Sequence, residues 1–480
     1  MSRSRLLRSS IPRIVVSLGV LVAVGTAPPV AGATTAESMG STIDRYLDHL
    51  VSDVDTPGLA VAVLDRDTTT THLTGRDGDG HDIATDTPFL IGSVAKSMTA
   101  TAVLALVRDG RLRLDDRIGA ALPWSPVPDA TVTQLLTHTA GFTSGDGLAV
   151  SERFDNAPGA VTRAARELRH SGRSGRYAYS DANYLMLGAL IEHVTGRPYA
   201  ATLHDTVLVP LGMSSTTASA DTARVSAGHR IWWGTPVRYD PGFDESGGPF
   251  GYVASTLGDM VVYARAQMGR DPGALDPSTL GELHRPRVRS GDDSYAFGWR
   301  TTPSEHGVVV HHTGATPGYF AHVMVRSDGR GVVMLANAYS ESRAPTLAAA
   351  AGDVLEILDG GAPAITPGDG VLAAVPWALG VVSILGALAV AAGLRHPPGR
   401  RTRVAAALGA LLVVGASLSA PTLLGATVRQ LWFWAPDVVV GLAAVALTWG
   451  AVSVVVAVRP AHGDLKWWSG RVRPRARAHD

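Results

Sequence analysis

Apolar residues gather at the two ends of this chain in uncharged runs. Near the N-terminus, Ile14–Val24 is apolar and follows four arginines between Arg3 and Arg13. The prolines at 28 and 29 end this run, and Ala31-Gly32-Ala33 has the small residues of a cleavage site. A basic region, a short apolar core and small residues in this order predict a secretory signal peptide over 1–33. The run is too short to cross a bilayer comfortably.

Three longer uncharged runs lie near the C-terminus, at 371–394, 404–428 and 438–458. Each can cross a hydrocarbon core of about 30 Å at about 1.5 Å per residue. We therefore expect three transmembrane helices within 371–458. A linker rich in Pro and Gly precedes them at 359–370, and a basic tail follows at 459–480.

The charges beside these runs predict their orientation. The link 395–403 carries four arginines and no acid, and the tail carries six basic residues against two aspartates, whereas the link 429–437 has only Arg429 as a basic residue. The positive-inside rule places the first link and the tail in the cytoplasm, and Trp432 and Trp434 fit the outer interface. Residues 34–370 then lie outside, where a signal peptide would also send them. We expect a multi-pass protein of the cell membrane.

The zero net charge of the whole chain is the sum of three unlike segments. Residues 1–33 carry +4, residues 34–360 carry −11, and residues 361–480 carry +7. Basic clusters lie only beside apolar runs, which makes a nucleic-acid partner unlikely on electrostatic grounds. The three apolar runs contain no His, Lys, Arg or Glu, so they suit an anchor in the lipid bilayer better than a transport path.

The pattern of strand-like and helical segments in the extracytoplasmic body, 34–358, predicts an α+β fold. Strand-like patterns occur at 59–64 and, joined by short turns, at 308–312, 319–326 and 331–337. Helical patterns lie between the two sets, at 93–108 and 181–194, and another follows at 343–358. We expect one antiparallel sheet flanked by helices, in which the first and last strands are brought together and a helical lobe is inserted between them.

Composition singles out one lysine. Only two of the 42 basic residues, Lys96 and Lys466, are lysines, and the other forty are arginines. Lysine can lose its proton when desolvated, whereas arginine stays charged, so Lys96 is either a functional base or an ordinary surface cation. The chain has no Cys, which excludes a thiol nucleophile, and its 16 His show no metal-ligand spacing. No metal site is expected.

Ser93-Val94-Ala95-Lys96 places a hydroxyl and an amine one helical turn apart, on the same face. A neutral Lys96 could take the proton of Ser93 and activate it for attack on a carbonyl, and the helix N-terminus favours negative charge there. Ser93 could instead be a helix N-cap.

Several segments in order resemble the penicillin-recognising serine hydrolases, in particular the branch of class C β-lactamases, related esterases and D-alanyl-D-alanine carboxypeptidases. The segments are Phe89–Ala100, Leu135–Gly141, Tyr177–Tyr184, Pro210–Met213, Ser255–Asp259 and His312-Thr313-Gly314. The resemblance covers about residues 40–357 and implies the β-lactamase/transpeptidase-like fold. Several motifs in the right order are more specific than any one of them.

The resemblance implies a role for each matching residue. Ser93 would be the nucleophile, and either Lys96 or Tyr179 would take its proton. The backbone N–H groups of Ser93 and Ala315 would form an oxyanion hole. Asp181 and the strand residues His312, Thr313, Gly314 and Ala315 would bind the substrate.

Two positions depart from the family pattern. Asp181 stands where the family has Asn; facing Lys96, its charge would favour the ammonium form, although Asp181 or Ser180 could instead cap the following helix. His312 stands where Lys is common, and a neutral His would hold a substrate carboxylate more weakly. His138 and His311 are interpreted as structural.

These patterns predict a membrane-anchored extracytoplasmic serine hydrolase that acts through an acyl-enzyme and needs no cofactor. Its substrates would be small molecules or peptides: cell-wall precursors, peptides with D-residues, or small esters. The alternative is a penicillin-binding or cell-wall-peptide-binding sensor that does not turn over.

Overall fold

An antiparallel sheet forms the centre of residues 39–358 in the computed structural model, which describes residues 39–270, 275–396, 399–423 and 425–458. Over that part of the chain the main sheet has eight strands in the order β2-β1-β12-β11-β10-β9-β8-β7. The expected signal peptide, 1–33, and the basic tail, 459–480, lie outside the described residues. The strands are β1 (Gly58–Asp65), β2 (Thr68–Gly75), β7 (Val288–Ser290), β8 (Asp293–Tyr295), β9 (Arg300–Ser304), β10 (Gly307–Thr316), β11 (Tyr319–Arg326) and β12 (Arg330–Ala336).

The first and last parts of the sheet are joined as the sequence predicts. β1 pairs antiparallel with β12, from Leu59 opposite Ala336 to Asp65 opposite Arg330. β10 runs to Thr316, four residues beyond the end expected for it, and a tight turn connects it to β11. Gly318 in that turn has φ +92°, a conformation that glycine adopts without strain.

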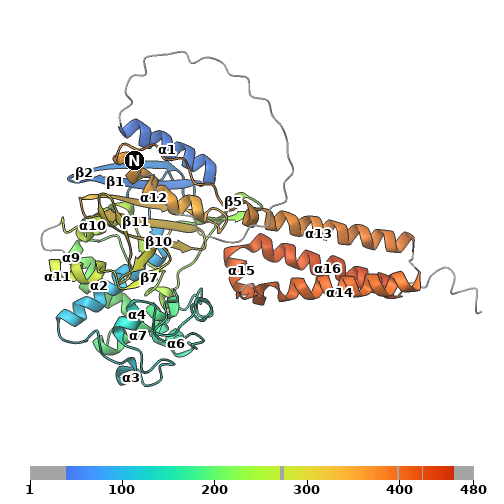
Figure 1. Ribbon diagram of the computed structural model, residues 1–480, viewed down its shortest axis with the longest axis horizontal. Coiled ribbons are helices and arrows are strands. Elements are labelled where there is room, and N and C mark those ends of the chain that lie inside the picture. Colours follow the sequence, from blue (N-terminus) through green and yellow to red (C-terminus); the bar gives the residue numbers. More distant parts are fainter. Residues whose placement is uncertain (1–38, 271–274, 397–398, 424, 459–480) are drawn as a thin grey trace, which may run out of the picture.

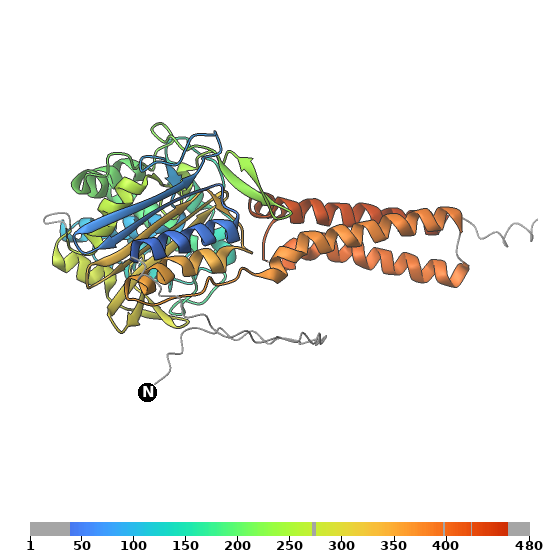
Figure 2. The same cartoon turned by 90° about the horizontal axis from the view of Figure 1, so that it is seen from above.

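Helices cover both faces of the sheet (Figures 1 and 2). α1 (Met39–Val54) and α12 (Ala344–Leu358) pack on one face, where Leu50, Val61, Met334 and Leu347 share an apolar core. The other face is buried under α2 (Ala95–Arg108), α7 (Asp181–Thr195) and α10 (Leu257–Gln267) in a larger core. The site described below lies on this second side, between the sheet and the helical lobe.

The helical lobe is the chain between β3 (Phe89–Leu90) and β7. Besides α2, α7 and α10 it contains η1 (Gly92–Val94), α3 (Ile118–Ala121), α4 (Val132–Leu136), α5 (Ser144–Leu148), α6 (Ala160–Arg166), α8 (Tyr199–Leu203), η2 (His204–Leu208), α9 (Val209–Leu211), η3 (Glu245–Gly247) and α11 (Pro277–His284). Two small sheets accompany it: β3 with β6 (Ala254–Ser255), and β13 (Ala338–Tyr339) with β4 (Gly228–Trp232) and β5 (Thr235–Tyr239). The α+β fold with an inserted helical lobe is confirmed.

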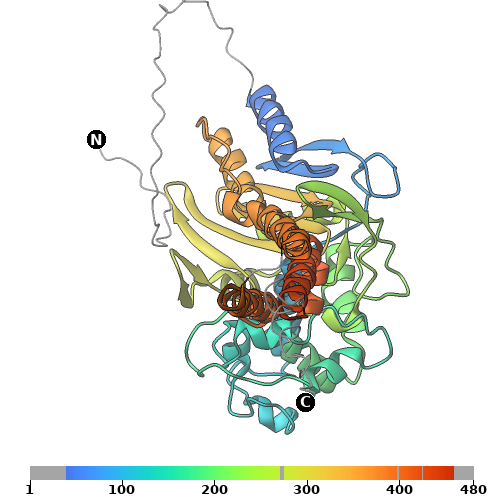
Figure 3. The same ribbon diagram turned by 90° about the vertical axis from the view of Figure 1, so that its right-hand side faces the viewer.

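Three long helices project from one side of the domain as a bundle, seen end-on in Figure 3. They are α13 (Gly370–Arg395), α14 (Arg400–Leu423) and α16 (Pro436–Val458), and within the described residues these are the helices long and apolar enough to cross a membrane. Small residues bring them together: a Cβ built on Gly386 of α13 would lie 2.6 Å from Thr448 Oγ1 of α16. The second apolar run differs in one respect from expectation, because α14 ends at Leu423 and a short helix, α15 (Val428–Trp434), follows it.

Candidate active site

Ser93 lies in the η1 turn that leads into α2. Gly92 before it has φ +52°, and a Cβ on Gly92 would come within 2.3 Å of Ala315 N on β10. Glycine therefore permits both the turn and the close approach of this turn to the strand. Neither the η1 turn nor α2 has a side-chain cap hydrogen bond, so Ser93 is not an N-cap. Its side chain is half-buried, and its Oγ accepts a hydrogen bond of 2.8 Å from Lys96 Nζ.

Lys96 is fully buried, and its ammonium group has three oxygen neighbours. Nζ donates to Ser93 Oγ and to the carbonyl oxygen of Phe250, each at 2.8 Å, and forms an ion pair with Asp181 Oδ1 at 2.6 Å. The pairing of β3 with β6 carries residue 250 to this position, since Ile91 N donates to Val253 O at 3.0 Å. Three N–H bonds facing three oxygens is the arrangement that a protonated lysine satisfies.

The charge of Lys96 follows from two opposed effects. Burial lowers the pKa of Lys96, because an ammonium group loses its hydration. The charges and hydrogen bonding of Asp181 and Tyr179 act the other way, and together they raise the pKa of Lys96 above its ordinary value. Lys96 is thus held as a cation at neutral pH.

Asp181 is the first residue of α7, and its neighbour performs the capping. The Ser180 side chain accepts a hydrogen bond of 3.3 Å from Ala182 N, which makes Ser180 the N-cap. Asp181 is free of that task and turns its carboxylate, 25% exposed, toward Lys96. The sequence left two roles open, helix capping and pairing with Lys96. Ser180 performs the first and Asp181 the second.

Tyr179 is held beside Lys96 by a buried aromatic cluster. Its ring centroid lies 5.1 Å from Lys96 Nζ and 4.4 Å from the ring of His138. His138 Nδ1 accepts from Ser180 N at 3.2 Å, and the His138 carbonyl accepts from Ala178 N at 2.9 Å. The loop that contains His138 thus supports the segment that contains Tyr179. This support from His138 agrees with a structural role.

The strand residues of the His-Thr-Gly motif form the opposite wall. β9 pairs with β10 only as far as His311, so the edge from His312 to Thr316 faces the site without a β9 partner. A Cβ on Gly314 would lie 2.8 Å from Ser93 N, which brings the N–H groups of Ser93 and Ala315 to the same small region. Thr313 and Ala315 are half-buried and Gly314 is buried.

His312 is more deeply buried than a side chain that binds a ligand directly. Its ring is 2% exposed; Nδ1 donates to the carbonyl of Thr313 at 2.6 Å, and Tyr295 Oη lies 3.2 Å from Nε2. Burial, with the positive charges of Lys96 and Arg300, lowers the pKa of His312 well below its ordinary range. His312 is therefore neutral and supports the aromatic cluster.

Two contributors to this site are not marked by the sequence motifs. The Phe250 carbonyl is a backbone group and leaves no side-chain signal. Arg300, at the start of β9, lies with its guanidinium carbon 5.9 Å from the ring centroids of both Tyr179 and Tyr295. Arg300 is half-buried and donates to Ser290 Oγ at 2.8 Å, so it supplies the cation that His312 does not. Its position depends on strand pairing, which spacing alone could not reveal.

Among the described residues no cluster of three or more His, Cys, Asp or Glu could hold a metal ion. The site is instead a hydroxyl, an ammonium group, a phenol and a strand edge that offers backbone N–H groups. Such a set can form and hydrolyse an ester on Ser93.

Comparison with known proteins agrees with this arrangement. The sequence profile of the Beta-lactamase family matches residues 43–356. Penicillin-binding protein 4 of Amycolatopsis lactamdurans is 31% identical over 325 residues, which cover 60% of this chain and 81% of that protein. Protein flp of Staphylococcus aureus strain MW2 is 29% identical over 275 residues, covering 53% of this chain and 54% of its own length.

Solved structures share the fold. The octameric penicillin-binding protein homologue of Pyrococcus abyssi aligns with a TM-score of 0.58 at 22% identity, covering 67% of this chain and 78% of its own. D-alanine carboxypeptidase AmpC of Burkholderia cenocepacia aligns with a TM-score of 0.56 at 23% identity, covering 66% of this chain and 98% of its own. The fold is thus the one shared by penicillin-binding-protein-like proteins and class C β-lactamases. The chain belongs to the beta-lactamase family.

Proposed function

We propose that this protein is a membrane-anchored serine hydrolase that forms an acyl-enzyme on Ser93. The observation that carries the proposal is the 2.8 Å hydrogen bond between Lys96 Nζ and Ser93 Oγ, formed in a site where Tyr179 and the edge of β10 converge. The hydrolase domain is 34–358, joined through 359–370 to the anchor 371–458. The reaction needs no cofactor.

The charge of Lys96 assigns the first proton transfer. An ammonium group cannot accept the Ser93 proton, so in this mechanism the acceptor is Tyr179 in its phenolate form, which becomes a neutral phenol, and Lys96 stabilises the negative charge that develops on Ser93 Oγ. Oγ attacks the carbonyl carbon, and the N–H groups of Ser93 and Ala315 hold the resulting oxyanion. Tyr179 returns the proton to the leaving amine or alcohol, and water then hydrolyses the ester.

Arg300 and the β10 edge suggest the substrate class. Thr313 and Ala315 can pair with an extended peptide, while Arg300 can bind a terminal carboxylate by charge-assisted hydrogen bonds. His312, being neutral, adds no charge to that interaction. This favours peptides that end in a D-residue with a free carboxylate, including cell-wall precursors, and small esters as poorer substrates.

The bundle geometry supports an extracytoplasmic active site. The hydrolase domain and α15 lie at one end of the three helices, and the end of α13 at Arg395 and the start of α14 at Arg400, which flank the arginine-rich link, lie at the other (Figure 1). By the positive-inside rule that link is cytoplasmic, which puts the domain outside. Because the chain has no Cys, single cysteines test this directly: Ser342→Cys should react with an impermeant maleimide on intact cells, and His396→Cys only after permeabilisation. The reverse pattern would overturn the topology.

A second candidate is a non-turnover penicillin-binding or sensor protein, and the ion pair of Lys96 with Asp181 favours it. A lysine held as a cation is a poor base, so an acyl-enzyme could form and persist.

Purified full-length protein in detergent separates the two candidates. Hydrolysis of D-Ala-D-Ala peptides, a short chromogenic ester and a chromogenic cephalosporin should be lost in Ser93→Ala and kept in Ser327→Ala, an exposed serine in the β11–β12 turn. Turnover that survives in Ser93→Ala would exclude the mechanism. Stable labelling by the cephalosporin without product release would establish the sensor.

A further inference from the structure

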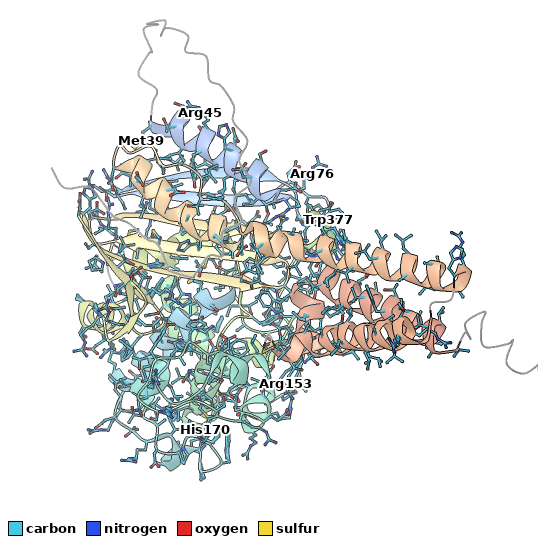
Figure 4. The ribbon with its side chains drawn as sticks, turned by 45° about the vertical axis from the view of Figure 1, so that its right-hand side comes forward. Met39, Arg45, Arg76, Arg153, His170 and Trp377 are labelled. Atoms are coloured by element: carbon cyan, nitrogen blue, oxygen red, sulfur yellow. The ribbon has the colours of Figure 1, made fainter. Side chains whose placement is uncertain are left out.

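The short helix α15 docks on the hydrolase domain beside the candidate active site. Arg429 donates to the backbone carbonyl of Glu152, Gln430 donates to the carbonyl of Leu148, and Trp434 Nε1 donates to Glu152 Oε1 at 3.3 Å. The rings of Phe433 and Phe154 lie 5.2 Å apart. Figure 4 shows Arg153, the next residue along, on the part of the domain that adjoins the end of the bundle.

The segment that receives α15 also touches Asp181. A Cβ built on Gly147 would lie 2.8 Å from Asp181 N and 2.9 Å from Ser180 Oγ, so α5 abuts the first turn of α7 without a gap. A continuous series of contacts therefore runs from α15 through residues 147–154 to Asp181, and from Asp181 to Lys96.

Glu152 is a buried carboxyl group within this series. It is 4% exposed, its backbone has φ +50°, and Ser151 Oγ donates to its Oε2 at 2.5 Å. Among the described residues no Lys or Arg forms an ion pair with its carboxylate, and a carboxyl group buried in this way at a contact between two parts of a protein suits the neutral form better than the charged form. The mechanism proposed above does not use it.

We propose that Glu152 is a proton-operated positioning residue: while it is neutral, α15 stays docked and residues 147–154 hold Asp181 against Lys96, and loss of its proton loosens both contacts. This inference rests on the proposed function for its effect on turnover. The docking itself does not depend on that function.

The surroundings of Glu152 give the direction of the pH effect. Burial raises the pKa of Glu152 to about 7; the hydrogen bond from Ser151 lowers it, the charge of Asp181 raises it, and Trp434 and Asp244 contribute smaller opposed effects. The charged and titratable groups that face it from the packed elements are Asp181, Asp244, Tyr239, Tyr252 and Arg429. Because the pKa of Glu152 is raised in the docked state, the advantage of that state is complete below the ordinary carboxyl pKa of about 4.5 and is lost as pH rises from there through about 7.

A cysteine pair in the full-length protein measures docking without reference to activity. The variant Phe154→Cys/Phe433→Cys, in an otherwise cysteine-free chain, should be cross-linked by a short bismaleimide. At each pH its cross-linking yield is divided by the yield of the same cysteine pair carrying Glu152→Gln. This ratio should be at least about threefold lower at pH 8 than at pH 6. The Gln background cancels the pH dependence of thiol chemistry, because it keeps the shape of Glu152 without its charge. Equal ratios at both pH values would overturn the proposal.

Turnover provides the second measurement. Ser93-dependent hydrolysis of a neutral ester should fall by about threefold or more above pH 7, and Glu152→Gln should remove this fall, whereas the exposed Glu305→Gln should keep it. Turnover that is Ser93-dependent but keeps the fall in Glu152→Gln would overturn the inference and leave the proposed function standing. A cross-link that depends on Glu152, in a protein without turnover, would support the inference and contradict the proposed function.

Discussion

Lys96 Nζ and Asp181 Oδ1 lie 2.6 Å apart, with the lysine fully buried and the aspartate at the first position of α7. Asp181 is one of the two positions at which this site departs from the family pattern. It fixes the charge of Lys96, and through it the route of the Ser93 proton.

Removing the charge of Asp181 should change the pH profile more than the maximal rate. In Asp181→Asn the pKa of Lys96 falls, because burial then lowers it without the opposing carboxylate. Lys96 is a cation only while pH stays below its pKa. A lower pKa of Lys96 should therefore move the alkaline limb of the pH–rate profile to lower pH. At pH values below that limb, acylation should be kept or improved. We would measure pre-steady-state acylation by a chromogenic cephalosporin across pH; a loss of about a hundredfold or more at every pH would show that the carboxylate itself is needed.

Lys96→Arg keeps the charge and should still lose about 10²–10⁴-fold in turnover. The bulkier planar guanidinium cannot place one N–H on each of Ser93, Phe250 and Asp181 in a fully buried site. Steady-state hydrolysis of the ester is the measurement, with the exposed Arg289→Lys as the control for a basic exchange. Unchanged turnover in Lys96→Arg would contradict the role given to this residue.

Arg300→Gln should raise KM for peptides with a free C-terminal carboxylate by about tenfold and leave KM for a neutral ester nearly unchanged. The reason is that Arg300 is the cation beside Tyr179, while His312 is neutral. Arg289→Gln, on β7, which β8 separates from the strand of Arg300, is the matched control. Equal effects on both substrates would mean that Arg300 acts on the fold of the site and not on the carboxylate.

Two glycines of α5 offer a paired test of how residues 147–154 hold Asp181. Gly147→Ala places a methyl group 2.8 Å from Asp181 N and should lower both turnover and stability, the latter by about 1–3 kcal/mol. Gly145→Ala, two residues earlier, meets only Thr143 Oγ1 at 3.9 Å and should change neither. Thermal unfolding and ester hydrolysis of the two variants, measured side by side, give the comparison.

Within the anchor, Gly386→Ala should lower the thermal stability of the bundle in detergent, because its Cβ would lie 2.6 Å from Thr448 Oγ1. Gly380→Ala, on the same helix, has no atom within 4 Å of its Cβ and should be neutral or slightly stabilising. If both variants unfold at the same temperature, the packing of α13 against α16 is looser than described.

Much of the fold could be predicted because its patterns are local. Short apolar runs mark β1, β11 and β12, and a long uncharged run marks each of α13, α14 and α16. The expectation that first and last strands meet in one sheet is confirmed by the pairing of Leu59 with Ala336. The short edge strands β7–β9 and helix α15 were not predicted, since a few residues carry too little periodicity to stand out.

The sequence alone determined the chemical groups of the site: a serine and a lysine one helical turn apart, a tyrosine, and a strand motif, each recognisable within a short segment of the chain. Only the tertiary structure decided which of the side chains in the site are charged. Asp181 faces Lys96, His312 is buried and neutral, and Arg300 reaches Tyr179. Likewise, α15 lies against Glu152 across 277 residues of sequence. Charge and burial depend on which segments meet in space, and no local pattern encodes that.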